Sequence, residues 1–205
     1  MSSKGYFDQV APQWDTMRKS FFSDQVREKA YAAAGVQAGK TAADVGAGTG
    51  FIAEGLIARS VNVIAVDQSE PMLAEMRERF GERIDCRLGG ADALPIPEEA
   101  VDYAFANMYL HHVDEPPRAI NEMARIVKPG GKLVITDLDE HHFDFLRIEQ
   151  YDRWMGFKRK DVERWFRAAG LKNVFVDCVG ENCCTDSKSG ADHATVSIFV
   201  ASGEK

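Results

Sequence analysis

A glycine-rich turn contains the residues of this chain that are best suited to binding chemistry. It reads Gly46-Ala47-Gly48-Thr49-Gly50 and joins a short apolar run at 41–45 to a predicted helix at 51–59. Because glycine has no Cβ, a ligand can approach the backbone N–H groups at the start of that helix. Asp67 follows the next apolar run, 21 residues beyond Gly46, near the spacing of about 20 at which a carboxylate binds ribose hydroxyls. Together these features predict a nucleotide-like cofactor.

The spacing of the glycines distinguishes cofactor classes. A dinucleotide-binding turn has the pattern G-x-G-x-x-G, whereas this chain has glycines at 46, 48 and 50 and Phe51 in place of the third glycine. That departure disfavours nicotinamide and flavin cofactors. A glycine turn that binds no ligand is the alternative, and the flanking strand, the following helix and Asp67 argue against it.

Histidines gather where ligands bind in α/β proteins. Four of the five histidines form the pairs His111-His112 and His141-His142, in loops expected at the carboxyl edge of the sheet. A general base is needed when the reacting group carries a proton, and we interpret His112 and His141 as candidates for that role or for orienting an acceptor. The alternative is that a histidine packs a loop or binds a backbone carbonyl. Zinc binding by His141, His142 and nearby carboxylates lacks a recognised ligand spacing, so no metal site is predicted.

The cysteines suggest a second kind of chemistry. Four cysteines are too few for a disulfide scaffold, and Cys86 in a predicted strand is most simply a small buried apolar residue. Cys183 and Cys184 fall in a predicted polar loop at 180–193. Two adjacent exposed thiols could capture a soft metalloid such as arsenite, because soft ions prefer sulfur ligands.

The elements that must position these residues alternate along the chain. Near-continuous apolar strands separated by helices are typical of a parallel sheet with helices on both faces. The predicted helices lie at 51–59, 71–80, 116–127 and 159–169, with one or two more between 6 and 34 and a less regular stretch at 138–157. The predicted strands lie at 41–45, 61–66, 84–88, 101–106, 132–136, 172–179 and 194–201.

Length and composition limit the remaining possibilities. The 205 residues fit a single domain, which we divide into a helical lid at 1–38 and an α/β core at 39–205. The formal net charge of −7 disfavours a nucleic-acid partner, because phosphate binding needs clustered Lys and Arg. No apolar run is long enough to cross a membrane and the first residues lack a signal-peptide core, so the expected location is the cytoplasm.

Five segments in order resemble a known family. The chain is similar to class I S-adenosylmethionine-dependent methyltransferases of type 11, in the branch of quinone-biosynthesis and arsenite methyltransferases, convincingly over about 41–136. The segments that carry the resemblance are Asp44–Gly50, Asp67, Ala91–Pro95, Leu110–Val113 and Ile126–Leu133. The resemblance implies a Rossmann-like α/β fold with a seven-stranded sheet, mostly parallel with an antiparallel last strand, helices on both faces and an N-terminal helical lid.

The resemblance also implies S-adenosyl-L-methionine as cofactor and assigns residues to it. The glycine turn would hold its methionine and ribose parts, Asp67 the ribose hydroxyls, and Asp92 the adenine amino group. The full set of implied cofactor-binding residues is Tyr6, Trp14, Asp44, Gly46, Ala47, Gly48, Gly50, Asp67, Gln68, Met72, Asp92, Ala93 and Asn107.

Three functions remain open at this point. The first is methyl transfer to a small-molecule acceptor by a monomer or homodimer. The second is methylation of a metalloid or thiol through Cys183 and Cys184, although the arsenite enzymes carry a cysteine after the glycine turn where this chain has Phe51-Ile52-Ala53. The third is a non-catalytic module that binds S-adenosylmethionine.

Overall fold

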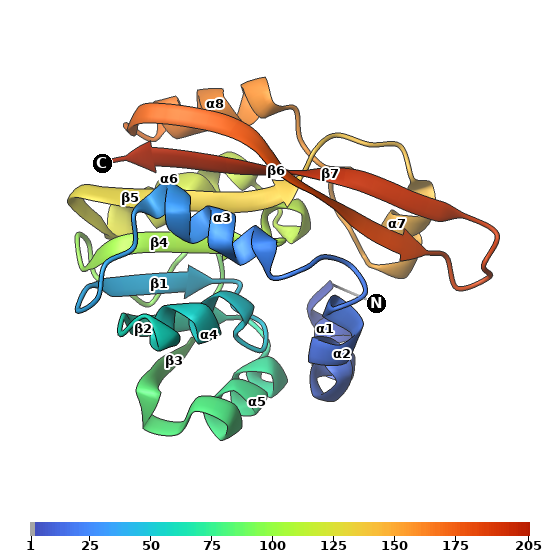
Figure 1. The fold of residues 1–205 in the computed structure, drawn as a ribbon, viewed down its shortest axis with the longest axis horizontal. Helices are drawn as coiled ribbons and strands as arrows, with labels where there is room; N and C mark the ends of the chain where they lie inside the picture. Colours follow the sequence, from blue (N-terminus) through green and yellow to red (C-terminus); the bar gives the residue numbers. More distant parts are fainter. Residues whose placement is uncertain (1–2) are drawn as a thin grey trace.

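The computed structural model describes residues 3–205, which form one seven-stranded sheet with the strand order β3-β2-β1-β4-β5-β7-β6 (Figure 1). The first five strands pair in parallel, and β7 runs antiparallel to both of its neighbours. This arrangement confirms the predicted Rossmann-like sheet with an antiparallel last strand. The strands are β1 Thr41–Val45, β2 Asn62–Asp67, β3 Ile84–Leu88, β4 Val101–Asn107, β5 Val127–Leu138, β6 Lys172–Asp186 and β7 His193–Glu204.

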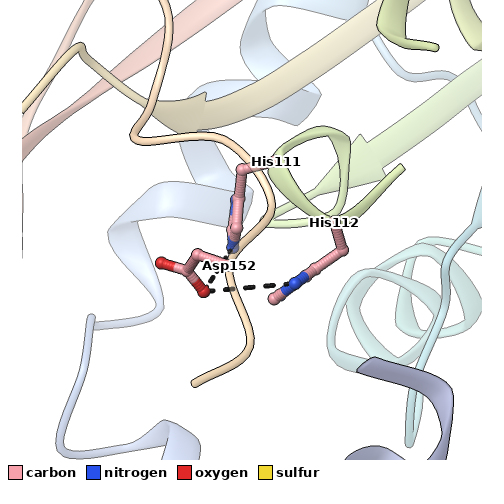
Figure 2. A group of neighbouring side chains, drawn as sticks. All are labelled: His111, His112 and Asp152. Carbon is pink, nitrogen blue, oxygen red and sulfur yellow. Dashed lines mark ion pairs between the residues drawn. The ribbon is translucent and has the colours of Figure 1, made fainter. Parts of the chain in front are cut away.

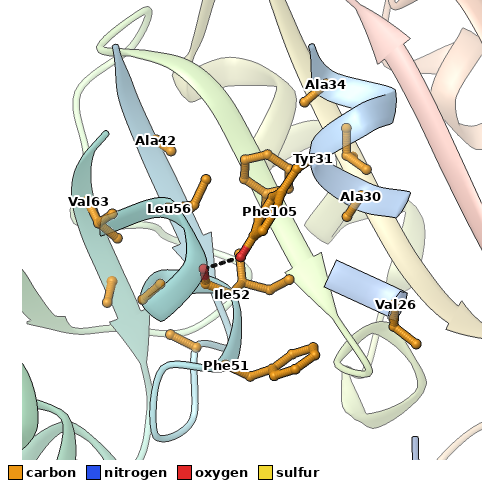
Figure 3. Close-up of a cluster of buried hydrophobic side chains, with 14 of the residues drawn as sticks. Val26, Ala30, Tyr31, Ala34, Ala42, Phe51, Ile52, Leu56, Val63 and Phe105 are labelled. Carbon is orange, nitrogen blue, oxygen red and sulfur yellow. Dashed lines mark hydrogen bonds between the residues drawn. The ribbon is translucent and has the colours of Figure 1, made fainter. Parts of the chain in front are cut away.

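Helices cover both faces of the sheet because the apolar side chains of each strand alternate between the faces. Ala42 and Phe105 pack with α3, α4 and α5, whereas Ala43 and Ala104 pack with α6 and α8. Figure 3 shows the first cluster, in which the hydroxyl of Tyr31 donates to the carbonyl of Ile52 at 2.6 Å. The helices are α3 Gln25–Ala34, α4 Phe51–Ala58, α5 Glu70–Phe80, α6 Pro116–Ile126, α7 Asp144–Glu149 and α8 Arg159–Ala168.

The N-terminal segment divides into two parts. The short helices α1 Ser3–Val10, η1 Ala11–Gln13 and α2 Trp14–Arg18 contact α5, whereas α3 packs on the sheet. Local signals explain the helix ends. Gly35 adopts φ 66° at the end of α3, and the side chain of Ser69 accepts from the N–H of Met72 at the start of α5.

Two regions differ from the sequence prediction. The expected polar loop at 180–193 is wrong, because β6 continues to Asp186 and pairs with β7, which begins at His193. A register shift between Cys178 and Asn182 interrupts the alternation in this edge strand, and most of its residues are exposed or half-buried, so its sequence resembles a loop. In addition, β5 starts at Val127 instead of 132, and α7 lies within the stretch expected to be irregular.

None of the helices in residues 3–205 combines the length and apolar character that a membrane span requires.

Candidate functional site

The glycine turn lies at the carboxyl end of β1 and leaves its backbone open. Gly46 and Gly48 have φ values of 68° and 54°, a left-handed conformation that L side chains rarely adopt. The N–H of Gly48 donates to one carboxylate oxygen of Asp67 at 2.8 Å, and the N–H of Ser69 donates to the other at 2.8 Å. Asp67 therefore links the turn after β1 to the turn after β2. The backbone of Gln68 also hydrogen-bonds to Asp67, so at least one of the four carboxylate lone pairs remains for a ligand.

Asp44 supports this turn from behind. Its buried carboxylate accepts from the N–H of Ala53 at 3.0 Å, which ties the end of β1 to the first turn of α4. Burial raises the pKa of Asp44 to about 7, although the hydrogen bond from Ala53 opposes that shift. Asp44 therefore holds the loop in place and lies outside the cavity.

A cavity lies over the glycine turn. The predicted site residues that line it are Trp14, Gly46, Ala47, Gly48, Asp67, Gln68, Met72, Asn107 and His112. A neighbouring cavity is lined by Gln68, Asp92 and His112, so Asp92 lies one cavity away. The predicted residues outside the lining of both cavities are Tyr6, Asp44, Gly50, Ala93 and His141.

Arg18 in the same cavity was not predicted from the sequence. Its side chain is buried, and its guanidinium stacks on the ring of Phe51 at 4.1 Å from the ring centroid. The Nε atom has no hydrogen-bond partner, and no carboxylate of residues 3–205 lies within ion-pair distance of it. Burial lowers the pKa of Arg18, but an arginine remains charged at neutral pH. Asp24, Asp15 and Glu54 favour its charge from a distance, so the cavity contains a cation that has no direct ion pair in the described part of the chain.

Tyr109 separates the two cavities and lines both of them. Its ring covers Gly46 so closely that a Cβ on this glycine would lie 2.1 Å from the Cδ2 atom of Tyr109. Burial raises the pKa of the Tyr109 hydroxyl, which hydrogen-bonds to the backbone of Ala91. Met108, the residue before it, has φ 50°, which turns the chain sharply after β4.

A third cavity of about 490 Å³ adjoins the first. The two share apolar side chains and one imidazole as lining, namely Phe7, Trp14, Phe22, Met108 and His112. The residues that line the third cavity and not the first include His111, Asp152 and Cys183. A ligand in the first cavity and a second molecule in the third would therefore meet across His112 and Met108.

Buried ionisable groups gather beside this third cavity (Figure 2). The Nδ1 atom of His111 lies 2.6 Å from the carboxylate of Asp137, and its Nε2 atom lies 3.7 Å from that of Asp152. Burial disfavours the charged form of His111, but the two facing carboxylates outweigh it and raise the pKa to about 9. Burial raises the pKa of Asp152 to about 6. Burial and the neighbouring His111 lower the pKa of His112.

Comparison with known proteins identifies the family. Residues 43–135 match the family described as a methyltransferase domain. The chain is 35% identical over 140 residues to a demethylmenaquinone methyltransferase of Renibacterium salmoninarum, covering 67% of this chain and 59% of the relative. Residues 43–135 of this chain belong to the methyltransferase domain family. The match spans the glycine turn, Asp67 and the histidine pair after β4.

Two further proteins show how widely the chain resembles known methyltransferases. It is 32% identical over 144 residues to a malonyl-acyl-carrier-protein O-methyltransferase of Methylococcus capsulatus, covering 65% of this chain and 52% of that protein. The fold superposes on phosphoethanolamine N-methyltransferase 2 of Haemonchus contortus, solved with S-adenosyl-L-methionine, with a TM-score of 0.72, 17% identity and coverage of 87% and 52%. The chain thus spans about half to three fifths of the length of these curated relatives.

Two groups of residues predicted from the sequence lie in unexpected places. His141 is buried away from the first and third cavities, with its Nδ1 accepting from the N–H of Phe143 and its Nε2 unpartnered. Cys183 and Cys184 lie in β6, where neighbouring side chains point to opposite faces of the sheet. Only Cys183 lines the third cavity, and burial raises the pKa of its thiol to about 12. The pair therefore does not present two exposed adjacent thiols.

The sequence prediction missed Arg18, Tyr109, His111, Asp137 and Asp152 as site residues. His111 was visible as half of a histidine pair, and Asp137 as the carboxylate that ends a predicted strand. Asp152 carried no local signal, since it lies in an irregular segment.

Proposed function

We propose that this protein transfers a methyl group from S-adenosyl-L-methionine to a small-molecule acceptor. One observation carries the proposal: the glycine turn and Asp67 line a cavity that shares a wall of Phe7, Trp14, Met108 and His112 with a second, mostly apolar cavity. Such a pair of joined cavities suits a reaction in which donor and acceptor must meet in line and without water.

The first cavity and its neighbour have acidic side chains for the sugar and adenine of the cofactor, and the first has a basic side chain for the cofactor's carboxylate. We assign the ribose hydroxyls to Asp67, the adenine ring to Gln68 and Met72, and the adenine amino group to Asp92. The unpaired guanidinium of Arg18 would receive the carboxylate of the methionine part, because a buried cation gains most from an anionic ligand. Trp14, Asn107 and the glycine turn would surround the rest, while Tyr6, Gly50 and Ala93 would support the lining without touching the cofactor.

S-adenosyl-L-methionine supplies a methyl group on a positively charged sulfur, so the acceptor needs a lone pair on the axis of the carbon–sulfur bond. His112 lines both cavities, and we propose that it orients the acceptor. Its lowered pKa keeps the ring neutral, which leaves a nitrogen lone pair able to accept a hydrogen bond. His141 would act by supporting the segment behind the cavity, because it lines neither cavity.

The helices α1 and α2 would form the lid over the bound cofactor. Phe7, Trp14 and Arg18 of this segment line the first cavity and close it against the glycine turn. We place the end of the lid at Arg18, because α3 of the expected 1–38 lid packs on the sheet with Val26 and Ala30 fully buried.

The acceptor would be a small molecule with an apolar body. The relatives include enzymes named for a quinone, for an O-methyl transfer and for an N-methyl transfer, so family membership leaves the attacked atom open. The apolar lining of the third cavity and the net charge of −7 favour a small metabolite over a nucleic acid. Four free cysteines fit a reducing compartment such as the cytoplasm.

Incubation with radiolabelled S-adenosyl-L-methionine and a metabolite extract tests the proposal. We expect label to pass to a small product and S-adenosylhomocysteine to accumulate. Cofactor binding without any labelled product would contradict methyl transfer and would favour a non-catalytic module.

Arg18→Gln tests the cofactor assignment, with Arg59→Gln as its matched control. Both arginines stack on an aromatic ring, Arg18 on Phe51 and Arg59 on Tyr31, but only Arg18 lines the cavity. We expect a roughly 10-fold or larger loss of cofactor affinity in Arg18→Gln, the effect of losing one charge-assisted pair. Equal affinities in the two variants would overturn the assignment.

A further inference from the structure

We propose that His111, His112 and Asp152 form a binding site for a divalent transition-metal ion at the floor of the acceptor cavity. The site joins two segments of the chain, the short helix η3 Leu110–His112 after β4 and the loop before α8. Figure 2 shows both imidazole rings directed toward the same carboxylate. Two imidazoles and one carboxylate are a common ligand set for zinc and for other first-row transition metals.

The ligand atoms lie close to the spacing that a metal requires. The nearest carboxylate oxygen of Asp152 is 3.7 Å from Nε2 of His111 and 4.0 Å from Nδ1 of His112, and all three ligand atoms lie within 4.8 Å of one another. Metal–ligand bonds of about 2.1 Å in tetrahedral geometry place neighbouring ligand atoms roughly 3.4 Å apart. The longest separation would have to shorten by up to about 1.4 Å, so side-chain movements of roughly 1 Å would complete the site.

Asp137 gives His111 the support that metal-binding histidines usually have. Its carboxylate lies 2.6 Å from Nδ1 of His111 and also accepts from the backbone N–H groups of Leu110 and Leu138, at 2.8 and 2.7 Å. A carboxylate on one ring nitrogen fixes the tautomer and directs the lone pair of the other nitrogen outward. In His111 that other nitrogen is the one facing Asp152.

His112 supplies an independent observation. Its side chain is 9% exposed, and its Nδ1 atom is buried with no hydrogen-bond partner in residues 3–205. A buried polar atom without a partner costs about 1 to 3 kcal/mol, so a native protein rarely retains one without a reason. The atom faces Asp152, and a metal ion between them would satisfy it.

Charge balance and loop geometry favour the same conclusion. Asp137 and Asp152 are both buried, and one divalent cation that binds His111 in place of its proton would neutralise both carboxylates. The loop that carries Asp152 is held against η3, because the N–H groups of Arg153 and Trp154 both donate to the carbonyl of His111 at 3.0 Å. The ligands therefore lie on a braced structure and not on a free loop.

The position of the ion links this site to methyl transfer. The inference about the acceptor rests on the proposed function. All three ligands line the third cavity, so the ion's remaining coordination positions would face the acceptor. This favours an acceptor with an ionisable oxygen, such as a phenol, because a bound cation lowers the pKa of that group. The acceptor hydroxyl gives its proton to water, its oxygen bonds to the methyl carbon, and the carbon–sulfur bond breaks to leave a neutral thioether. His112 would then orient the acceptor through the ion.

Metal titration of the whole protein tests the site without requiring activity. After treatment with a chelator and dialysis, native protein is titrated calorimetrically with Zn²⁺, and with Co²⁺ while its visible absorption is recorded. We expect one equivalent of either ion to bind, with a cobalt spectrum typical of nitrogen and oxygen ligands. Absence of stoichiometric binding by native protein would overturn the site.

Three variants test whether these side chains bind the metal ion. We expect His112→Ala and Asp152→Asn to lose roughly 100-fold or more in affinity, and Asp137→Asn to lose roughly 10- to 100-fold as a supporting residue. His193→Ala is the control, because His193 is exposed and pairs with Asp186 on the β6–β7 hairpin. Loss in this control with retention in the other variants would contradict the proposal. Calorimetry with S-adenosylhomocysteine in Asp152→Asn and Asp137→Asn separates the metal site from the cofactor site, because neither residue lines the cofactor cavity and loss of the metal site alone would leave cofactor binding intact.

Discussion

The two halves of the candidate site are built in different ways. The cofactor side uses backbone groups of one short turn, Gly46 to Gly50, and ties it by hydrogen bonds to Asp67 on the neighbouring strand. The acceptor side uses side chains brought from separate segments, including His111, Asp137, Asp152 and Cys183. The first half is therefore determined by local sequence, and the second by how the whole chain packs.

The difference has an energetic consequence. A backbone turn tolerates exposure, because water can satisfy its N–H groups when no ligand is bound. Buried carboxylates and imidazoles have no such substitute, so the acceptor side depends on every partner being present. We expect substitutions on the acceptor side to affect folding and substitutions on the cofactor side to affect binding.

The largest effect should come from Asp137→Ala. The substitution leaves a buried imidazole and the backbone N–H groups of Leu110 and Leu138 without their acceptor, which should lower the free energy of unfolding by about 3 to 5 kcal/mol. Urea denaturation measures the change. Asp177→Ala, at an exposed position on β6, should change it by less than about 0.5 kcal/mol. Equal midpoints for the two variants would show that the acceptor side is not held by this cluster.

Asp44, on the cofactor side, should make stability depend on pH. The pKa of Asp44 is raised to about 7 in the folded protein, against about 3.9 in an unfolded chain. The folded state therefore binds more protons between these values, so the free energy of unfolding should fall by about 2 kcal/mol from pH 5 to pH 7 because of this group. Asp44→Asn should remove that fall, since its amide oxygen still accepts from Ala53 without ionising. Parallel pH profiles of native and variant proteins would contradict the assignment.

A substitution in the glycine turn should separate binding from folding. Gly48→Val places a side chain at the cofactor cavity, whereas Gly190→Val imposes a similar left-handed strain, at φ 70° against 54°, in open space on the β6–β7 turn. We expect Gly48→Val to lose roughly 10- to 100-fold in affinity for S-adenosylhomocysteine. Gly190→Val should bind like native protein, and similar destabilisation should appear in both. A loss of affinity in both variants would mean that strain, not steric blocking, determines binding.

The smallest expected effect is a difference between two cysteine thiols in their rate of alkylation. Because burial raises the pKa of Cys183 to about 12 whereas Cys178 is exposed, iodoacetamide at pH 8 should modify Cys178 at least about 10-fold faster. Mass spectrometry of digested protein gives both rates. Faster modification of Cys183 would restore the metalloid interpretation that its position in β6 argues against.

Sequence alone predicted the glycine turn and Asp67 on the cofactor side because their signals are local. The glycines and the carboxylate at Asp67 each act within a few residues of a strand or helix end. The antiparallel final strand followed from family resemblance and is confirmed by the pairing of β7 with β5.

The residues of the acceptor side could not be predicted from the sequence, and the reason is physical. Asp152 meets His111 only because the chain turns at Tyr151, which has φ 61°, and because the loop binds to the backbone of His111. Arg18, on the cofactor side, was missed for the same reason, because its position in the cavity depends on stacking against Phe51. In β6, a register shift at Cys178 breaks the alternation by which a strand is detected. None of these contacts has a counterpart in local residue spacing.

The most direct test of the central claim is a calorimetric titration with S-adenosyl-L-methionine. We expect native protein to bind one equivalent with a Kd on the order of micromolar, and Asp67→Ala to bind roughly 100-fold more weakly, because the substitution removes a charged acceptor from the cavity. Asp85→Ala, at an exposed position on β3, should match native protein. No heat of binding at millimolar cofactor, or equal affinities in native protein and Asp67→Ala, would contradict the claim that this turn and this carboxylate hold the methyl donor.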